Sequence, residues 1–305
     1  MKILIFGAGA LGSVFGGFLS REHEVTLIGR EPHMRAIARR GLRISGIWGE
    51  HTFTRLRALT SVEQLPEKRF DLVMITTKSY DTATAVREVA PFAGDGVLSM
   101  QNGIGNEEAI ASVVGEERTL GGMAIFGARL LEPGSVEVTV YASECLVGEL
   151  RGGLSQRACE IAAHFTGAGI PTKPSEDIIR DKWLKAFYNI ALNPLSAILR
   201  VPYGKLGELE ETRRLMREML KEAFAVAGAK GIRIGYTWEE YFHHLLENLL
   251  PPTARHISSM LQDIERGKRT EIDYMNGAIV KLGRELGIAT PVNETITAIV
   301  RALER

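Results

Sequence analysis

The chain opens with Lys2-Ile3-Leu4-Ile5-Phe6-Gly7-Ala8-Gly9-Ala10-Leu11-Gly12. The apolar run over residues 3–6 is typical of a buried parallel strand, and an apolar helical pattern follows the last glycine. In a strand–Gly-x-Gly-x-x-Gly–helix arrangement, Gly7 permits a tight turn, Gly9 admits a pyrophosphate and Gly12 lets the helix pack closely. We therefore predict that residues 7–12 bind a dinucleotide at the helix N-terminus, where unpaired N–H groups face the phosphates. The alternative is a glycine turn that binds nothing.

Arg30 follows the second predicted strand, residues 24–28, after a single glycine. Sites specific for NAD usually carry Asp or Glu near this position, because a carboxylate bonds the ribose 2′-hydroxyl. A guanidinium instead suits a phosphate dianion. Arg30 therefore predicts that the cofactor is NADP (NADPH). Glu31 leaves an alternative open, because a one-residue shift would place a carboxylate at the ribose.

The composition is that of an ordinary globular protein without a strongly charged surface. The 305 residues are 45% hydrophobic, and 37 basic side chains balance 37 acidic ones. Nothing therefore indicates a nucleic-acid or membrane partner. Cys145 and Cys159 fit free thiols in a reducing compartment, and the absence of a Cys/His cluster with ligand spacing predicts no metal. With no signal peptide or membrane-length apolar run, we expect a soluble cytoplasmic protein; a homodimer is compatible with the sequence, which does not fix the oligomeric state.

The first half of the chain alternates predicted strands and helices. The clearest are strands over 70–75 and 96–100, a helix over 82–89, and a helix capped by Asn106. This alternation predicts an α/β, Rossmann-like, doubly wound and mostly parallel sheet in an N-terminal domain, residues 1–173. A hairpin around 132–140 is expected to add an antiparallel edge to that sheet.

Strand signals vanish after Pro174, and helical patterns take their place. We expect helices over 176–199 (capped by Ser175), 209–229, 238–249, 253–266, 272–286 and from 291 to the C-terminus. These patterns predict an all-α C-terminal domain, residues 174–305. We expect the chemistry in the cleft between the domains, because open α/β sheets bind ligands beyond the C-terminal ends of their strands.

A polar stripe marks the first of these helices. Lys185, Asn189 and Asn193 recur every four residues and share a face with Lys182. Their neighbours are apolar, so buried amides here need hydrogen-bond partners, and a bound polar ligand is one source. A solvated polar face is the alternative. Helical spacing does not distinguish Lys182 from Lys185.

Further polar candidates lie elsewhere in the chain. Lys78 and Asn102 each follow a predicted strand of the first domain, where side chains face the cofactor, although Lys and Asn-Gly are also common in turns. A second cluster spans 258–263 and 270–273. Capping is the alternative there, with Gly267 ending one helix and Thr270 starting the next.

Taken together, these segments resemble the ketopantoate reductase (2-dehydropantoate 2-reductase) family nearly end to end. The matching segments are Gly7–Gly12, Lys78, Gln101-Asn102-Gly103, Lys185 with Asn189 and Asn193-Pro194-Leu195, and Ser258–Gln262 with Thr270–Asp273. The resemblance implies NADPH-dependent reduction of a 2-oxo acid, with 2-dehydropantoate converted to pantoate for pantothenate and coenzyme A biosynthesis.

The resemblance also implies residue roles, and it selects Lys185 over Lys182. It implies Lys185 as general acid, Asn189 and Asn193 as ligands of the terminal hydroxyl, Ser259 as carboxylate donor, Asn102 at both cofactor and substrate, and Lys78, Ala128 and Glu271 at the cofactor. An ammonium suits the first role, because hydride attack builds negative charge on the ketone oxygen and an ammonium donates the proton. Tyr203 and His256 depart from the family pattern, which carries Asn at or near both positions, so the exact 2-oxo acid stays open.

Two other functions remain open. A 3-hydroxyacid dehydrogenase of the 6-phosphogluconate type has a similar two-domain layout and a catalytic lysine. The second is a non-catalytic NADP-binding sensor or scaffold. The polar residues around Lys185 argue against this second function.

Overall fold

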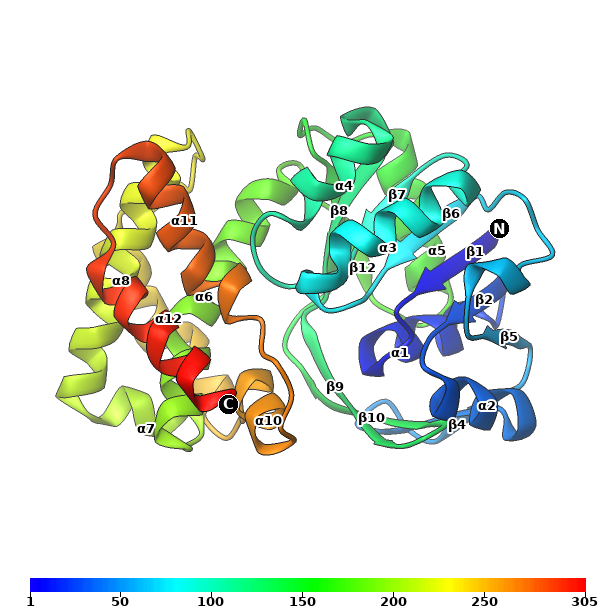
Figure 1. Cartoon of the computed structure of the whole chain (residues 1–305), viewed down its shortest axis with the longest axis horizontal. Coiled ribbons are helices and arrows are strands. Elements are labelled where there is room, and N and C mark those ends of the chain that lie inside the picture. Colours follow the sequence, from blue (N-terminus) through cyan, green and yellow to red (C-terminus); the bar gives the residue numbers. More distant parts are fainter. The chain divides into compact units, whose positions relative to one another are not determined.

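The computed structural model describes residues 1–305, which form two compact units (Figure 1). The first unit comprises residues 1–102 and 106–179, and the second comprises residues 103–105 and 180–305. The chain passes from the first unit to the second after residue 179, within helix α6 (Ile178–Leu199). The boundary predicted from the sequence lies six residues earlier, after residue 173. Residues 103–105 join the second unit because the Ile104 N–H donates to the Tyr274 carbonyl at 2.8 Å. No helix combines the length and apolar composition needed to cross a bilayer.

The first unit is built on an eight-stranded sheet in the order β12-β11-β8-β7-β6-β1-β2-β5. Its strands are β1 (Lys2–Phe6), β2 (Glu24–Ile28), β5 (Leu56–Leu59), β6 (Leu72–Ile75), β7 (Val97–Ser99), β8 (Thr119–Met123), β11 (Cys145–Glu149) and β12 (Thr172–Pro174). All neighbours from β5 to β8 are parallel, whereas β11 runs antiparallel to β8 and carries β12 at the edge. The predicted mostly parallel sheet with an antiparallel edge is confirmed.

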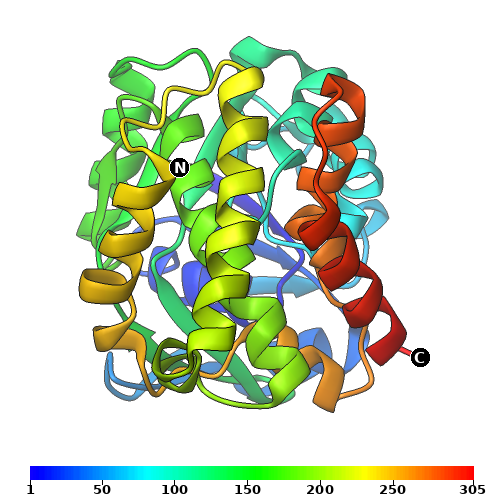
Figure 2. The same cartoon turned by 90° about the vertical axis from the view of Figure 1, so that its left-hand side faces the viewer.

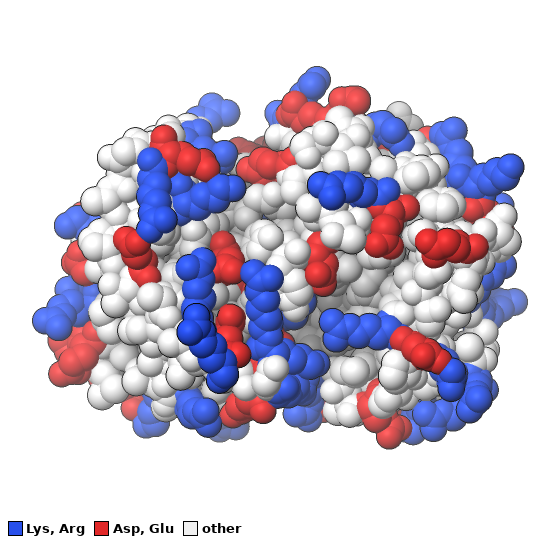
Figure 3. Space-filling model, viewed as in Figure 1, with Lys and Arg blue, Asp and Glu red and all other residues white.

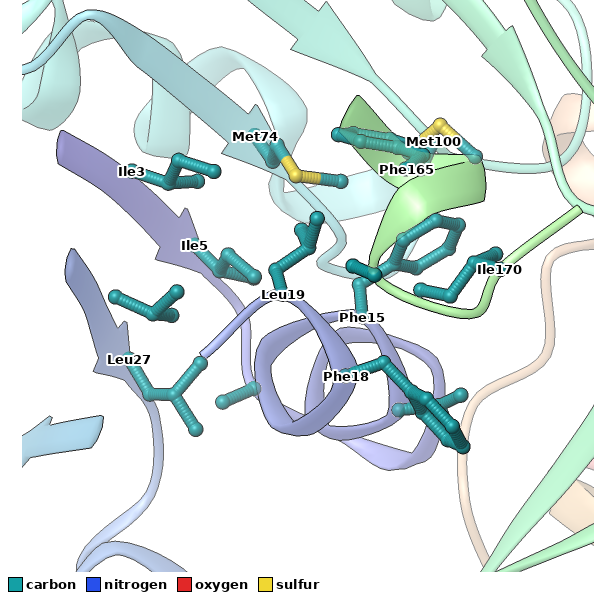
Figure 4. Close-up of a cluster of buried hydrophobic side chains, with 14 of the residues drawn as sticks. Ile3, Ile5, Phe15, Phe18, Leu19, Leu27, Met74, Met100, Phe165 and Ile170 are labelled. Atoms are coloured by element: carbon teal, nitrogen blue, oxygen red, sulfur yellow. The ribbon is translucent and has the colours of Figure 1, made fainter. Parts of the chain in front are cut away.

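Helices cover both faces of this sheet, as its alternating side chains require. The helices are α1 (Ala10–Leu19), α2 (Glu31–Arg40), α3 (Thr82–Val89), α4 (Asn106–Val114) and α5 (Gln156–Gly167), with 3-10 turns at Val62–Gln64, Ser79–Asp81, Ala90–Phe92 and Glu116–Arg118. Ile3 and Ile5 of β1 pack with α1 and α5, whereas Leu4 packs with α3 and α4. Figure 4 shows the first of these clusters, where Phe15 and Leu19 of α1 lie beside the sheet.

The hairpin around 132–140 lies in a second sheet, so the expectation that it edges the main sheet is wrong. This four-stranded sheet has the order β4-β3-β10-β9. Its strands are β3 (Leu42–Gly46), β4 (His51–Phe53), β9 (Phe126–Glu132) and β10 (Ser135–Tyr141). Val136 and Val138 of β10 are fully buried in the core cluster that contains α1. The sheet therefore covers α1, and its alternating apolar pattern arises from that contact.

The second unit consists of helices (Figure 2). Besides α6 these are α7 (Tyr203–Glu208), α8 (Glu210–Ala229), α9 (Trp238–His244), α10 (Ser259–Glu265), α11 (Asn276–Leu286) and α12 (Pro291–Leu303), with a π-helical segment at Leu245–Leu249 and 3-10 turns at Pro251–Thr253 and Ile272–Tyr274. Helices α8, α11 and α12 pack against one another. Phe187 of α6 stacks on Phe224 of α8 with ring centroids 4.2 Å apart. Basic and acidic side chains are interspersed over the face in Figure 3, as zero net charge allows.

The helix predicted over 272–286 is a 3-10 turn at Ile272–Tyr274 followed by α11, which begins at Asn276. Two further predicted helix starts differ from the structure. The predicted helix over 253–266 is broken, because α10 begins only at Ser259, where Ser258 Oγ accepts from the Leu261 N–H at 3.0 Å. Ser175 Oγ accepts from the Asp177 N–H at 3.1 Å, in the turn before α6 begins at Ile178. In both places a local side-chain bond to the backbone sets the helix start at a different residue from the predicted one.

Candidate active site

The three glycines after β1 have separable roles. Gly7 has φ of +97°, and a Cβ there would lie 2.5 Å from the Thr77 backbone. A Cβ at Gly12 would lie 2.4 Å from Thr76 Oγ1. At Gly9 a Cβ would meet only the Gly7 carbonyl at 3.8 Å, so nothing in the chain itself requires glycine there. The turn therefore leaves open space where a pyrophosphate would approach the N-terminus of α1, and these residues fit a dinucleotide.

Arg30 stands at the N-cap position of α2 with an extended backbone. Its side chain is exposed, and its guanidinium makes no ion pair or hydrogen bond within the chain. Glu31, the acid that left NAD open as an alternative, pairs instead with Arg35 one helical turn later. The residue available to a ribose substituent at the end of β2 is therefore a cation, which fits a 2′-phosphate.

A buried histidine, which the sequence reasoning missed, supports this region. His33 Nδ1 accepts from the Gly134 N–H at 2.9 Å, and His33 Nε2 lies 2.8 Å from Ser13 Oγ. Burial lowers the pKa of His33 below 6.5. The ring thus ties the first turn of α2 to α1 and to the β9–β10 turn. The only signal in the sequence is its spacing of three residues from Arg30.

A second missed network joins the ends of β6 and β7. Gln101 Nε2 donates to Thr82 Oγ1 at 2.8 Å, and Thr82 Oγ1 donates to Asn106 Oδ1 at 2.8 Å. Ser79 Oγ and Asn106 Nδ2 both donate to the Asn102 carbonyl, at 2.8 and 2.7 Å. Asn106, predicted as a cap, is thus the first residue of α4 and a fully buried member of this network. These bonds fix the loops that carry Lys78 and Asn102.

The predicted cofactor contacts fall into both units. Lys78 precedes the turn after β6, Asn102 follows β7, and both are half-buried. Ala128 lies on β9, half-buried against the core cluster around α1. Glu271 belongs to the second unit, where it is buried at the start of the Ile272–Tyr274 turn.

Helix α6, which bears the polar stripe, contains Pro194 in its interior. Pro194 has no N–H, so the carbonyl of Ile190, four residues earlier, loses its usual helical donor. Asn276 Nδ2 donates to that carbonyl at 3.2 Å and replaces the missing bond. Asn276 is itself fully buried and donates to Asn293 Oδ1 at 3.0 Å. The helix is therefore supported where the sequence would interrupt it.

The residues of the stripe differ in burial and in partners. Lys182 is 8% exposed, whereas Lys185 is half-buried. Asn189 is 8% exposed, and its side-chain amide has no hydrogen-bond partner within the chain. Since these amide atoms are also not buried polar atoms left unsatisfied, they reach solvent and are open to a ligand.

Asn193 is 3% exposed, and both polar atoms of its side chain have neighbours inside the unit. Its Oδ1 accepts a hydrogen bond from the Tyr203 hydroxyl, and its Nδ2 lies 3.5 Å from Met275 Sδ. Burial raises the pKa of Tyr203 well above 10.0. The His256 ring packs on Tyr203 with centroids 5.2 Å apart, and burial lowers the pKa of His256 below 6.5. Tyr203 therefore lies beside Asn193, and His256, the other residue that departs from the family pattern, packs on Tyr203.

The structure distinguishes the two adjacent serines at the start of α10. Ser258 is fully buried and serves as N-cap, and its Oγ also lies 3.4 Å from the Asn193 carbonyl. Ser259 is exposed. For the second cluster, where capping was the alternative, Thr270 Oγ1 accepts from the Ile272 N–H at 3.2 Å, but the N-cap residue of the Ile272–Tyr274 turn is Glu271, without a side-chain cap bond. Helix α10 ends at Glu265, before Gly267.

Comparison with known proteins gives matches over nearly the whole chain. Family models described as "Ketopantoate reductase PanE/ApbA" and "Ketopantoate reductase PanE/ApbA C terminal" match residues 3–152 and 177–304. A 2-dehydropantoate 2-reductase of Aquifex aeolicus (strain VF5) is 40% identical over 312 residues, covering 100% of this chain and 97% of the relative.

Two solved structures are also similar. A crystal structure of a PanE/ApbA family ketopantoate reductase from Ralstonia eutropha JMP134 is 34% identical with a TM-score of 0.87, covering 100% of this chain and 98% of that one. A ternary structure of D-mandelate dehydrogenase with NADH and anilino(oxo)acetate is 30% identical with a TM-score of 0.91 and the same coverage.

Proposed function

The chain belongs to the ketopantoate reductase family, and we propose that it catalyses the NADPH-dependent reduction of 2-dehydropantoate to pantoate. The observation that carries this proposal is the Asn189 amide, which lies on the same helix face as Lys185, has no partner in the chain and is open to a ligand. A small polar substrate beside Lys185 would supply that partner. The product would enter pantothenate and coenzyme A biosynthesis. We further propose that the enzyme works in the cytoplasm, and a homodimer is compatible with the proposal.

The proposed cofactor contacts are those that the family resemblance implies. The glycine turn (Gly7, Ala8, Gly9, Ala10, Leu11, Gly12), Arg30, Lys78, Asn102, Ala128 and Glu271 are the proposed contacts. NADPH, when bound, supplies the hydride. Since a D-mandelate dehydrogenase of similar fold binds NADH, the preference for NADPH depends on Arg30, whose free guanidinium suits a 2′-phosphate.

Lys185 is the proposed general acid. Reduction of the C2 ketone adds a hydride at carbon and leaves negative charge on oxygen. The Lys185 ammonium stabilises that charge and transfers one proton to the oxygen, which completes the hydroxyl. The resulting neutral amine regains its proton from water. The half-buried position of Lys185 supports this role, because water can reach it to restore the proton.

The substrate would be held at both ends. Ser259, exposed at the start of α10, is the proposed donor to the carboxylate. Asn189 and Asn193 are the proposed ligands of the terminal hydroxyl, and Asn102 would contact both substrate and cofactor. Orientation of the ketone between fixed polar groups is what the protein contributes to the rate besides the proton.

The test is a substrate panel on the purified protein. We expect NADPH oxidation with 2-dehydropantoate and the formation of pantoate, identified by mass spectrometry. Oxidation of 3-hydroxyisobutyrate with NADP⁺ and no reduction of 2-dehydropantoate would favour the 3-hydroxyacid dehydrogenase. Tight NADPH binding without turnover of any 2-oxo acid would favour the sensor.

A further inference from the structure

Tyr203 and Asn193 form a buried polar pair outside the proposed chemical step. We infer that Tyr203 is a positioning residue for substrate specificity: its hydroxyl fixes the Asn193 amide so that Asn193 can only donate to the terminal hydroxyl of the substrate. The inference rests on the proposed reduction of a 2-oxo acid that carries such a hydroxyl.

The contacts of Asn193 permit one amide orientation. Tyr203 Oη donates to Asn193 Oδ1, and Asn193 Nδ2 lies against Met275 Sδ at 3.5 Å. A flipped amide would place Oδ1 against the thioether sulfur, which has no hydrogen to donate. That buried oxygen would then be unsatisfied, which is unfavourable. A thioether is also a weak acceptor, so the Asn193 N–H groups keep their capacity to donate to a ligand.

Tyr203 is itself held rigidly. Its backbone N–H donates to the His256 carbonyl at 3.1 Å, and the Tyr188 ring packs edge-on with centroids 5.7 Å apart. Because burial raises the pKa of Tyr203 well above 10.0, the hydroxyl keeps its proton and remains a donor to Asn193 at physiological pH. The orientation of the Asn193 amide is therefore constant.

Asn189 supplies the complementary half of the recognition. The terminal hydroxyl of the substrate both accepts and donates a hydrogen bond. Asn193, which can only donate, therefore satisfies the hydroxyl oxygen but not the hydroxyl hydrogen. The Asn189 amide lies one helical turn earlier on the same face and has no partner in the chain. Its oxygen can accept the hydroxyl hydrogen. The pair thus selects a 2-oxo acid with a terminal hydroxyl over its deoxy analogue, which leaves the Asn193 N–H donors and the Asn189 oxygen without a ligand partner.

The first measurement is the ratio of kcat/KM for 2-dehydropantoate to kcat/KM for 3,3-dimethyl-2-oxobutanoate, the analogue without the hydroxyl. Y203F removes only the hydroxyl that orients Asn193. We expect the ratio to fall about tenfold, through KM for 2-dehydropantoate rather than kcat, as the loss of one well-placed hydrogen bond predicts. Y241F is the matched control, because Tyr241 is also 2% exposed and donates one buried hydrogen bond, to the Leu184 carbonyl at 2.7 Å. We expect Y241F to keep the ratio of the parent.

A double-mutant cycle separates positioning from direct contact. In an N193A background Y203F should cause no further change in the ratio, because Tyr203 acts through Asn193. Thermal unfolding of each variant checks the fold. If Y203F does not fold, N193D tests the same step, since it keeps an acceptor for Tyr203 but lacks the N–H donors, and its ratio should also fall.

The outcomes are distinguishable. An unchanged ratio in folded Y203F, or in N193D if Y203F is unfolded, overturns the inference and leaves the proposed function standing. A further fall caused by Y203F in the N193A background shows that Tyr203 contacts the substrate itself and also overturns it. A parent protein that does not reduce 2-dehydropantoate, or does not prefer it, refutes the proposed function and the inference together.

Discussion

His33 Nδ1 accepts a hydrogen bond from the Gly134 backbone N–H at 2.9 Å, so the ring must be neutral with its proton on Nε2, where it donates to Ser13 Oγ. Burial lowers the pKa of His33 below 6.5. Because the folded protein binds this proton less tightly than the unfolded chain, the stabilisation is complete above about pH 6.5 and is lost as the pH falls through the lowered pKa. We expect the urea midpoint to fall with acidification, and part of that fall to disappear in His33→Asn.

Asparagine is the suitable comparison because its amide oxygen still accepts near the Nδ1 position but does not titrate over this range. The pKa values of His23 and His256 are also lowered, but both histidines are present in the parent protein and in the His33→Asn variant. The difference between the two pH profiles therefore reports His33 alone. Parallel profiles would show that His33 is not the titrating group.

The preference for NADPH over NADH should depend on Arg30 and not on Arg35, the next arginine along the chain. Arg30→Ala should raise KM for NADPH about ten- to a hundredfold and leave KM for NADH nearly unchanged, because a charge-assisted contact to the 2′-phosphate is lost. Arg35→Ala is the matched control, since Arg35 is occupied by an exposed pair with Glu31. Equal use of NADPH and NADH by the parent protein would contradict the assignment of Arg30.

The glycines of the turn should separate folding from cofactor binding. Gly12→Ala should lower the free energy of unfolding by about 1–3 kcal/mol, because the new Cβ would overlap Thr76 Oγ1. Gly9→Ala should unfold at the Tm of the parent without cofactor but bind NADPH more weakly, since its Cβ would fill only the open space of the turn. Equal NADPH affinity in parent and Gly9→Ala would show that the cofactor does not approach this backbone.

Asn189 should show an opposition between stability and function. Its amide has no partner in the chain, so Asn189→Leu, of similar size, removes no hydrogen bond and should leave Tm unchanged or raise it. The same change should raise KM for 2-dehydropantoate, because the terminal hydroxyl loses a ligand. Chemical denaturation and steady-state kinetics on one preparation check both parts. A destabilised variant with normal KM would assign Asn189 a structural role only.

The local pattern of the chain predicts most of the first unit, because each buried strand and its following helix have their own periodicity. It does not predict the second sheet. Residues 43–46 pair with residues 135–138. An alternating apolar strand shows that one face is buried without showing against what it is buried. The start of α10 escapes prediction for a different reason, because Ser258 caps the helix in the middle of an otherwise helical pattern.

For the site, spacing predicts the shared face of Lys185, Asn189 and Asn193 but not which amide oxygen already has a partner in the chain. The partner of Asn193 is Tyr203 on another helix, and that contact depends on the turn between α6 and α7. The His33–Gly134 bond joins residues 101 positions apart. Such contacts arise from tertiary packing, which no local pattern encodes.

The most direct test of the account is kcat for 2-dehydropantoate reduction in Lys185→Ala and in Lys182→Ala, the two lysines that share one face of α6. Lys185→Ala should lower kcat about a hundredfold or more, the usual scale for a general acid, with little change in NADPH affinity. Lys182→Ala should retain kcat within a few-fold of the parent protein. A Lys185→Ala enzyme with near-normal kcat, or a Lys182→Ala enzyme that loses it instead, would contradict the account.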